Sequence, residues 1–183
     1  MEKVQRKSFT AENKIYFWTA TIHNWYHLLQ DDAEKKIITN SLKTLSDKGL
    51  ITIFAFVIMP NHIHLIWQLN GANGKESTKS SLLKFTAHEF KKKLKSTKEL
   101  EDYKVQAANK AYEFWQRDSL GIEIWSRKVA MQKLDYIHGN PVVGKWQLAK
   151  DDISYNYSSA KFYEYGIDEF GFLNNLYKEF DGD

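Results

Sequence analysis

The sequence contains no cysteine, only two prolines and no long uninterrupted hydrophobic segment. Without cysteine, neither a disulfide framework nor a thiolate metal site can form. No segment approaches the roughly 18 consecutive apolar residues that a membrane span requires, and the first 25 residues lack a signal-peptide pattern. We therefore expect a cytoplasmic protein that has no contact with a membrane.

The composition that remains is that of a globular domain. Of 183 residues, 43% are hydrophobic, 15% are aromatic and 27% are charged, which is enough apolar material to bury a core. No linker resembles a domain boundary, so we predict a single domain over residues 1–183. Its core is expected at about residues 15–163, flanked by a loose N-terminal segment and an acidic C-terminal tail.

Charge is unevenly distributed along the chain. Residues 75–98 contain eight lysines and two glutamates, a net charge of +6, whereas residues 151–183 contain eight acidic residues and two lysines, a net charge of −6. Residues 82–94 have helical periodicity with most lysines outward. Such a helix could contact backbone phosphates or could be an ordinary solvated surface. The acidic segment could be a spacer or a cover.

Two histidines lie one residue apart in the apolar segment FVIMPNHIHLIWQ, residues 56–68. In a β-strand, His62 and His64 share one face, and the residues between and after them share the other. Two imidazoles on one face could bind a divalent metal, or could be partly buried side chains hydrogen-bonded to the backbone. Residues 51–59 form a preceding apolar strand, and Pro60 and Asn61 predict a turn, so a hairpin is expected.

The rest of the chain predicts alternating strands and helices. A strand is expected at residues 15–22, a helix from about residue 31 to Gly49, and a mobile polar loop at residues 70–81. A second helical piece is expected at about residues 99–113 and a late strand around residues 122–125. The aromatic C-terminal segment is expected to wrap back over the domain.

Residues 127–139 predict the last well-defined helix, with Ala130, Leu134 and Ile137 as its apolar stripe. Lys133 and Tyr136 lie on a separate face. Asn140, four residues after the tyrosine, is expected at or just past the helix end because it precedes a proline. On helical position alone, Tyr136 also fits a boundary tyrosine whose hydroxyl lies in water.

The segments MPNHIHLIWQL and LDYIHGNPV together resemble the two signature motifs of single-tyrosine HUH transposases, and most closely those of REP-associated tyrosine transposases. They occur in the right order, about 70 residues apart, and the resemblance covers roughly residues 16–163, including YSSAKFY. It implies an α+β fold, a ferredoxin-like antiparallel sheet with helices packed on it. It also implies that Tyr136 is the nucleophile and that His62, His64 and Asn140 bind Mg²⁺ or Mn²⁺.

The activity implied by this resemblance is that of a DNA transposase, a site-specific endonuclease for single-stranded DNA. It would cleave and rejoin hairpin-flanked DNA through a 5′-phosphotyrosine, as a monomer or a homodimer. The lysines that we expect to contact DNA are Lys84, Lys91, Lys92, Lys95 and Lys133. Two alternatives stay open: a domesticated, non-catalytic DNA-hairpin-binding protein, and a metal-dependent hydrolase in which Tyr136 is structural.

Overall fold

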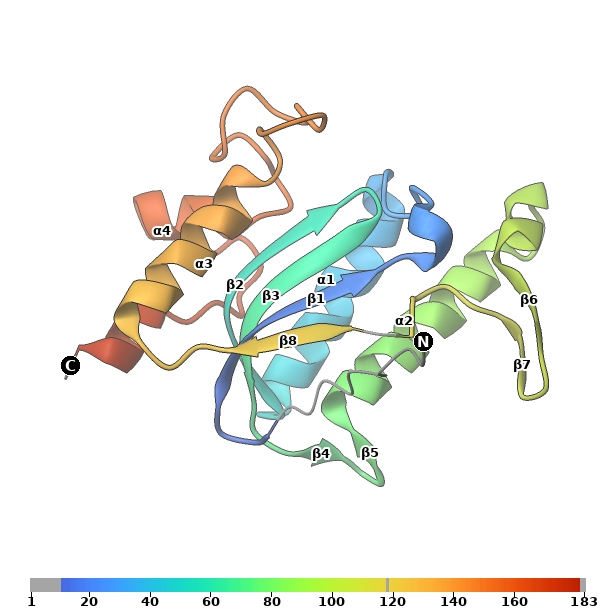
Figure 1. Ribbon diagram of the computed structural model, residues 1–183, viewed down its shortest axis with the longest axis horizontal. Coiled ribbons are helices and arrows are strands. Elements are labelled where there is room, and N and C mark those ends of the chain that lie inside the picture. Colours follow the sequence, from blue (N-terminus) through green and yellow to red (C-terminus); the bar gives the residue numbers. More distant parts are fainter. Residues whose placement is uncertain (1–10, 118, 182–183) are drawn as a thin grey trace, which may run out of the picture.

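The computed structural model describes residues 11–117 and 119–181. Its central sheet has four antiparallel strands in the order β2-β3-β1-β8 (Figure 1). The strands are β1 (Ile15–Thr21), β2 (Ile51–Met59), β3 (His62–Leu69) and β8 (Leu120–Glu123). Helix α1 (Asp32–Asp47) follows β1, and α2 (Thr78–Leu94) comes between β3 and β8. This is the βαββαβ order of a ferredoxin-like fold, so the predicted α+β class is confirmed.

Helices cover both faces of the sheet. Figure 1 shows α1 and α2 on one side and α3 (Arg127–Gly139) on the other. On the α1 side, the rings of Trp18 and Trp67 stack with their centres 4.7 Å apart in the core. Because both faces are covered, β3 is buried along nearly its whole length, and only Gln68 is partly exposed. The two histidines therefore lie under α3 rather than at an open surface.

Helix α3 forms where its sequence predicts. The Ser126 side chain accepts a hydrogen bond from the Val129 backbone N–H (3.4 Å), which caps the first turn. The expected stripe of Ala130, Leu134 and Ile137 is buried against the sheet. Asn140 is the C-terminal cap, and the proline that follows prevents another turn.

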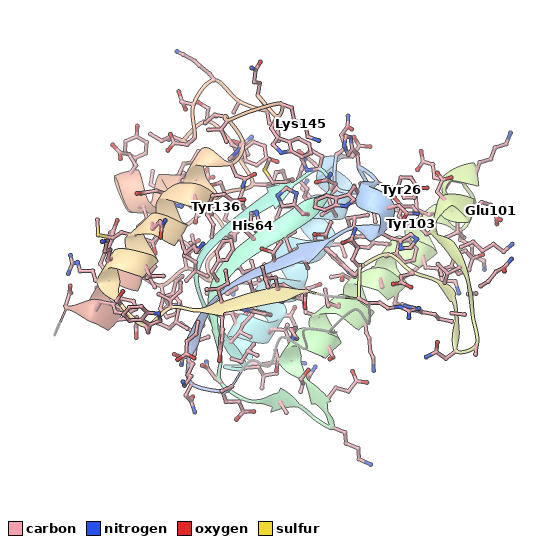
Figure 2. The ribbon with its side chains drawn as sticks, viewed as in Figure 1. Tyr26, His64, Glu101, Tyr103, Tyr136 and Lys145 are labelled. Atoms are coloured by element: carbon pink, nitrogen blue, oxygen red, sulfur yellow. The ribbon has the colours of Figure 1, made fainter. Side chains whose placement is uncertain are left out.

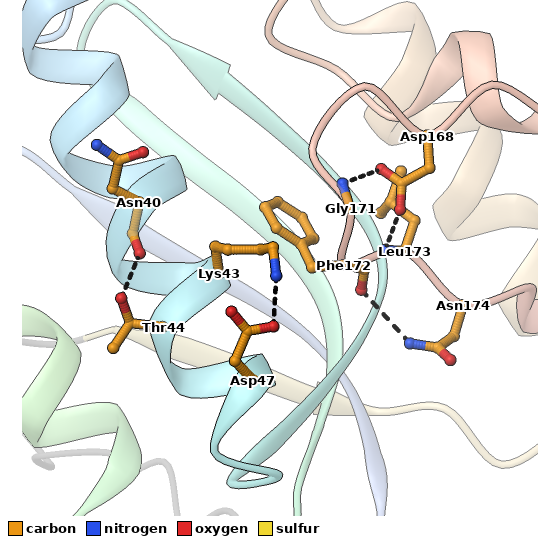
Figure 3. Close-up of polar contacts among 9 residues, drawn as sticks. All are labelled: Asn40, Lys43, Thr44, Asp47, Asp168, Gly171, Phe172, Leu173 and Asn174. Carbon is orange, nitrogen blue, oxygen red and sulfur yellow. Dashed lines mark hydrogen bonds and ion pairs between the residues drawn. The ribbon is translucent and has the colours of Figure 1, made fainter.

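The acidic C-terminal segment covers the outer edge of β2. The Ile58 N–H donates to the Tyr157 carbonyl (2.9 Å), and the Asn174 N–H donates to the Ile53 carbonyl (2.8 Å). Between them lie α4 (Ala160–Tyr165) and a loop in which Asp168 accepts from several backbone N–H groups next to α1 (Figure 3). A short 3₁₀ helix, Leu176–Phe180, closes the segment. Packed residues thus extend well past residue 163, where the core was expected to end. That the chain forms a single domain stays a prediction.

Two segments differ from expectation. The predicted polar loop contains a small hairpin of β4 (Ala72–Asn73) and β5 (Glu76–Ser77), turned at Gly74 with φ +67°, and α2 begins directly after it. The helix predicted at about 99–113 is wrong. That segment is a 3₁₀ helix (Lys98–Tyr103) and a hairpin of β6 (Lys104–Ala107) and β7 (Lys110–Tyr112).

The physical reason lies in how that second segment is anchored. Leu100 and Tyr103 are buried, and the Glu113 N–H donates to the Tyr103 carbonyl (2.8 Å), so the chain must double back. Asn109 lies in the two-residue turn, a position that suits asparagine. The expected loose N-terminal segment falls mostly on residues 1–10, outside the described residues. In the described ranges, no helix is long and apolar enough to cross a membrane.

Candidate active site

The two histidines of β3 are each held by a neighbouring polar side chain. His62 Nδ1 lies 2.7 Å from Asn61 Oδ1, and His64 Nδ1 lies 2.7 Å from Thr19 Oγ1. An amide oxygen only accepts hydrogen bonds, so His62 must donate from Nδ1 and keep a lone pair on Nε2. Thr19 stands opposite His64 in the β1–β3 register, so strand pairing itself supplies this partner.

Burial keeps both imidazoles neutral. It lowers the pKa of His62 to about 4, opposed by a hydrogen bond with the Asn140 side chain and assisted by the charge of Lys145. It lowers the pKa of His64 to about 3, with further contributions from His62 and Lys133. A neutral imidazole whose Nδ1 is already hydrogen-bonded keeps Nε2 as its ligand atom, which is the usual arrangement for histidine ligands of a metal.

His64 Nε2 is buried and has no hydrogen-bond partner among the described residues. An unsatisfied buried nitrogen is costly, so its presence calls for a ligand. The His62 and His64 ring centres are 4.7 Å apart, and the Asn140 amide reaches His62 from the end of α3. Two nitrogen donors and one amide fit a divalent ion such as Mn²⁺. In residues 11–117 and 119–181, no group of three or more His, Asp or Glu side chains forms a metal site.

Helix α3 brings Tyr136 and Lys133 to the same place. The Tyr136 ring centre lies 5.3 Å from that of His64 and 5.8 Å from that of Phe17, yet the residue is 52% exposed. Lys133 Nζ lies 4.9 Å from the Phe17 ring centre and 6.0 Å from that of Tyr136. A reachable phenol, a cation and two neutral imidazoles therefore converge (Figure 2 shows Tyr136 beside His64).

The other predicted lysines lie elsewhere. Lys84 is paired with Glu76, and Lys92 lies 3.9 Å from Glu89. Lys91 lies over the Tyr112 ring at 4.9 Å. Together with Lys92, Lys95 and His88, it lines a pocket of about 600 Å³ between α2 and the following hairpin. This surface belongs to the side of the sheet opposite α3 (Figure 1), so α2 is not part of the histidine site.

Several residues around the site were not predicted. Thr19 and Phe17 come from alternate positions of β1, and Asn61 precedes the first histidine. The alternation of side chains along β1 and its antiparallel pairing with β3 could have indicated that Thr19 and Phe17 face the site. Lys145 and Trp146 lie in the loop after α3, and nothing in their local sequence indicates that they reach His62.

Comparison with known proteins supports the fold. No protein-family model matches the chain, and no curated protein sequence matches it. Among solved structures, a REP-associated tyrosine transposase bound to a REP hairpin superposes with a TM-score of 0.62 and 18% identity, over 96% of this chain and 93% of the other. A transposase candidate from Deinococcus radiodurans R1 gives a TM-score of 0.42 and 15% identity, over 76% and 97%, too low to carry weight. The chain therefore has the fold of a REP-associated tyrosine transposase, as its two motifs predict.

Proposed function

We propose that this protein is a metal-dependent tyrosine transposase, an endonuclease that cuts and rejoins single-stranded DNA next to a hairpin. One observation carries the proposal: the exposed Tyr136 phenol lies beside His64, whose buried Nε2 has no partner in the described part of the chain. A buried nitrogen that could bind a metal, next to a reachable nucleophile, fits metal-assisted cleavage of a phosphodiester by a tyrosine. The hairpin on the structural neighbour supports DNA as the substrate.

In the reaction, the Tyr136 oxygen attacks phosphorus and the bond from phosphorus to the 3′ oxygen breaks. The phenol proton passes to water, and the leaving 3′ oxygen takes a proton from water. A 5′-phosphotyrosine and a free 3′-hydroxyl result, and rejoining reverses these steps. Because one ester replaces another, rejoining needs no ATP. Lys133, whose Nζ lies 6.0 Å from the Tyr136 ring centre, would stabilise the negative charge that develops on the phosphate.

His62, His64 and Asn140 are the residues that would hold the ion. A divalent ion bound there supplies Lewis acidity toward a phosphate oxygen. The histidines themselves contribute by staying neutral and by being held in a fixed orientation. Asn61 and Thr19 orient the rings, and burial keeps protons off them at neutral pH.

The test is a cleavage assay with labelled hairpin oligonucleotides taken from DNA flanking the protein's own gene, with Mn²⁺ or Mg²⁺, on a denaturing gel. We expect a slow-migrating, protease-sensitive adduct that chelation abolishes. Tyr136→Phe should lower adduct formation on the order of 10³-fold or more. Tyr165→Phe, which changes another exposed tyrosine, is the matched control and should leave it unchanged.

Two outcomes would replace the proposal. Hairpin binding without an adduct under either metal would favour the non-catalytic DNA-binding protein. Cleavage that survives Tyr136→Phe and leaves no covalent protein would favour the hydrolase in which this tyrosine is structural.

A further inference from the structure

A second pocket adjoins the histidine site on the side away from Tyr136. Its volume is about 460 Å³, and its walls include Trp146, Lys145 and His27. The half-buried Trp146 ring separates it from the site, with its centre 6.0 Å from that of His62 and 5.7 Å from that of His27. The pocket and the candidate metal ligands therefore share a wall.

The aromatic rings follow one another in a fixed order across the site. Tyr136 contacts His64 at 5.3 Å between ring centres, His64 contacts His62 at 4.7 Å, and His62 contacts Trp146 at 6.0 Å. The tyrosine stands at one end of this row and the pocket at the other. In Figure 2, Tyr136 lies to the left of His64, and Lys145 lies above it and to the right.

The direction from which Tyr136 attacks the phosphate indicates which part of the DNA lies at the Trp146 pocket. In an in-line displacement, the entering and leaving oxygens lie on opposite sides of phosphorus. A phosphate held at the two histidines and attacked from Tyr136 therefore has its leaving 3′ oxygen on the Trp146 side. We propose that the Trp146 pocket binds the nucleotide immediately 5′ of the scissile phosphate, whose 3′ oxygen leaves. This assignment rests on the proposed function. It adds that the DNA on the 5′ side of the cut lies toward Trp146.

The chemistry of the pocket suits a nucleotide. Trp146 offers an aromatic surface for a base, and such stacking is worth about 1–3 kcal/mol per base. Lys145 Nζ lies 5.2 Å from the Trp146 ring centre, and its charge also reaches His62, so it can meet a phosphate next to the base. None of the residues that line the pocket is acidic, although the Asp32 carboxylate lies 3.4 Å from Lys35 in its wall. In the described part of the chain, Lys145 forms no ion pair.

Lys35, also in the wall, is already engaged. Its Nζ donates to the Gln30 carbonyl (2.7 Å) and lies 3.4 Å from Asp32. This leaves Lys145 as the cation available to the nucleotide. The loop that carries it closes on itself, because the Leu148 N–H donates to the Pro141 carbonyl (2.8 Å) directly after Asn140. The pocket wall thus continues from the end of the nucleophile helix.

The experiment measures binding of two fragments of the mapped cleavage site to the non-cleaving Tyr136→Phe protein. One fragment ends in the 3′-hydroxyl at the cut, and the other begins with its 5′-phosphate. Trp146→Ala should weaken binding of the first fragment about tenfold, from the lost stacking, and leave the second within twofold. Trp146→Phe should retain most of the affinity. Trp125→Ala, which removes a tryptophan that is 74% exposed, is the control and should change neither.

Lys145→Ala should also weaken the first fragment alone and lower the salt dependence of its binding by about 0.7 in log–log slope, the loss of one phosphate contact. Equal weakening of both fragments by Trp146→Ala, or weakening of neither, would overturn the assignment while the adduct assay still supported the tyrosine. Failure to form any adduct with wild-type protein would overturn both, so the two failures are distinct.

Discussion

Lysines lie on two faces of this molecule, and the two faces differ in the residues that surround each lysine. On the α3 side, Lys133 and Lys145 stand singly against aromatic rings beside two neutral, buried histidines. On the α2 side, lysines are numerous, but several are matched by acids, as in the Lys84–Glu76 and Lys93–Glu34 pairs. Figure 1 places the two helices on opposite sides of the sheet.

The comparison shows that a lysine-rich segment of the sequence need not mark the candidate active site. An exposed lysine among acids contributes little and is screened by salt. A single lysine near a desolvated imidazole acts through a lower dielectric, and it adds to burial, which is the main cause of the lowered histidine pKa. The α3 face is therefore expected to govern catalysis, and the α2 face at most affinity.

Among the effects on binding affinity, the largest is expected for the metal. His64→Ala removes the buried Nε2 without a partner, and we expect affinity for Mn²⁺ to fall on the order of 100-fold. Isothermal titration calorimetry of the free protein measures this without depending on activity. His88→Ala, which changes an exposed histidine on α2, should leave the affinity unchanged, and equal losses in both variants would remove the distinction between the faces.

The next effect concerns stability and pH, measured with a chelator present. Unfolded histidines take up protons below their ordinary pKa near 6.5, whereas burial holds the folded pKa of His62 and His138 at about 4 and that of His64 at about 3. The unfolded state thus binds more protons in this window, and the free energy of unfolding must fall as pH falls from about 6.5 to 4. Between pH 7 and pH 5 we expect a loss of about 2 kcal/mol per histidine.

Urea unfolding at the two pH values checks this expectation. His138→Gln should shrink the difference, because it removes one buried histidine that otherwise packs near Tyr163 and shares a hydrogen bond with Ser159 (2.9 Å). His88→Gln should leave the difference as it is. Equal stability of the wild-type protein at pH 7 and pH 5 would mean that burial does not keep the site histidines neutral.

Much of the α3 face could be predicted because its elements are locally specified. Strand alternation placed both histidines on one face, and helical spacing with a proline stop indicated where Tyr136 and Asn140 lie. The fold class was implied by the family resemblance of the two motifs, and the predicted order of elements agreed with it. The roles of these residues in metal binding and catalysis stay predictions.

What could not be predicted depends on contacts between distant segments. Thr19 becomes the partner of His64 only through strand pairing, and Trp146 reaches His62 only because a loop folds over the β2–β3 turn. The second hairpin was missed because Tyr103 is fixed by a backbone bond from Glu113, ten residues further on, which helical periodicity cannot reveal. The lysine-rich helix was predicted at residues 82–94, but α2 begins earlier, at Thr78. Its side of the sheet follows from topology alone.

The smallest expected effect comes from comparing lysines across the two faces. Lys133→Ala should slow adduct formation about tenfold at saturating DNA, because it removes charge next to the attacked phosphate. Lys91→Ala combined with Lys95→Ala should leave that saturated rate unchanged and weaken DNA binding only a few-fold, with the salt slope lower by about 1.4 for two lost contacts to single-stranded DNA. Lys36→Ala with Lys48→Ala, on and just after α1, removes the same charge from exposed positions and is the control. If the α2 pair slowed the saturated rate as much as Lys133→Ala, the basic helix would belong to the catalytic site, and the separation of the two faces argued from their geometry would be wrong.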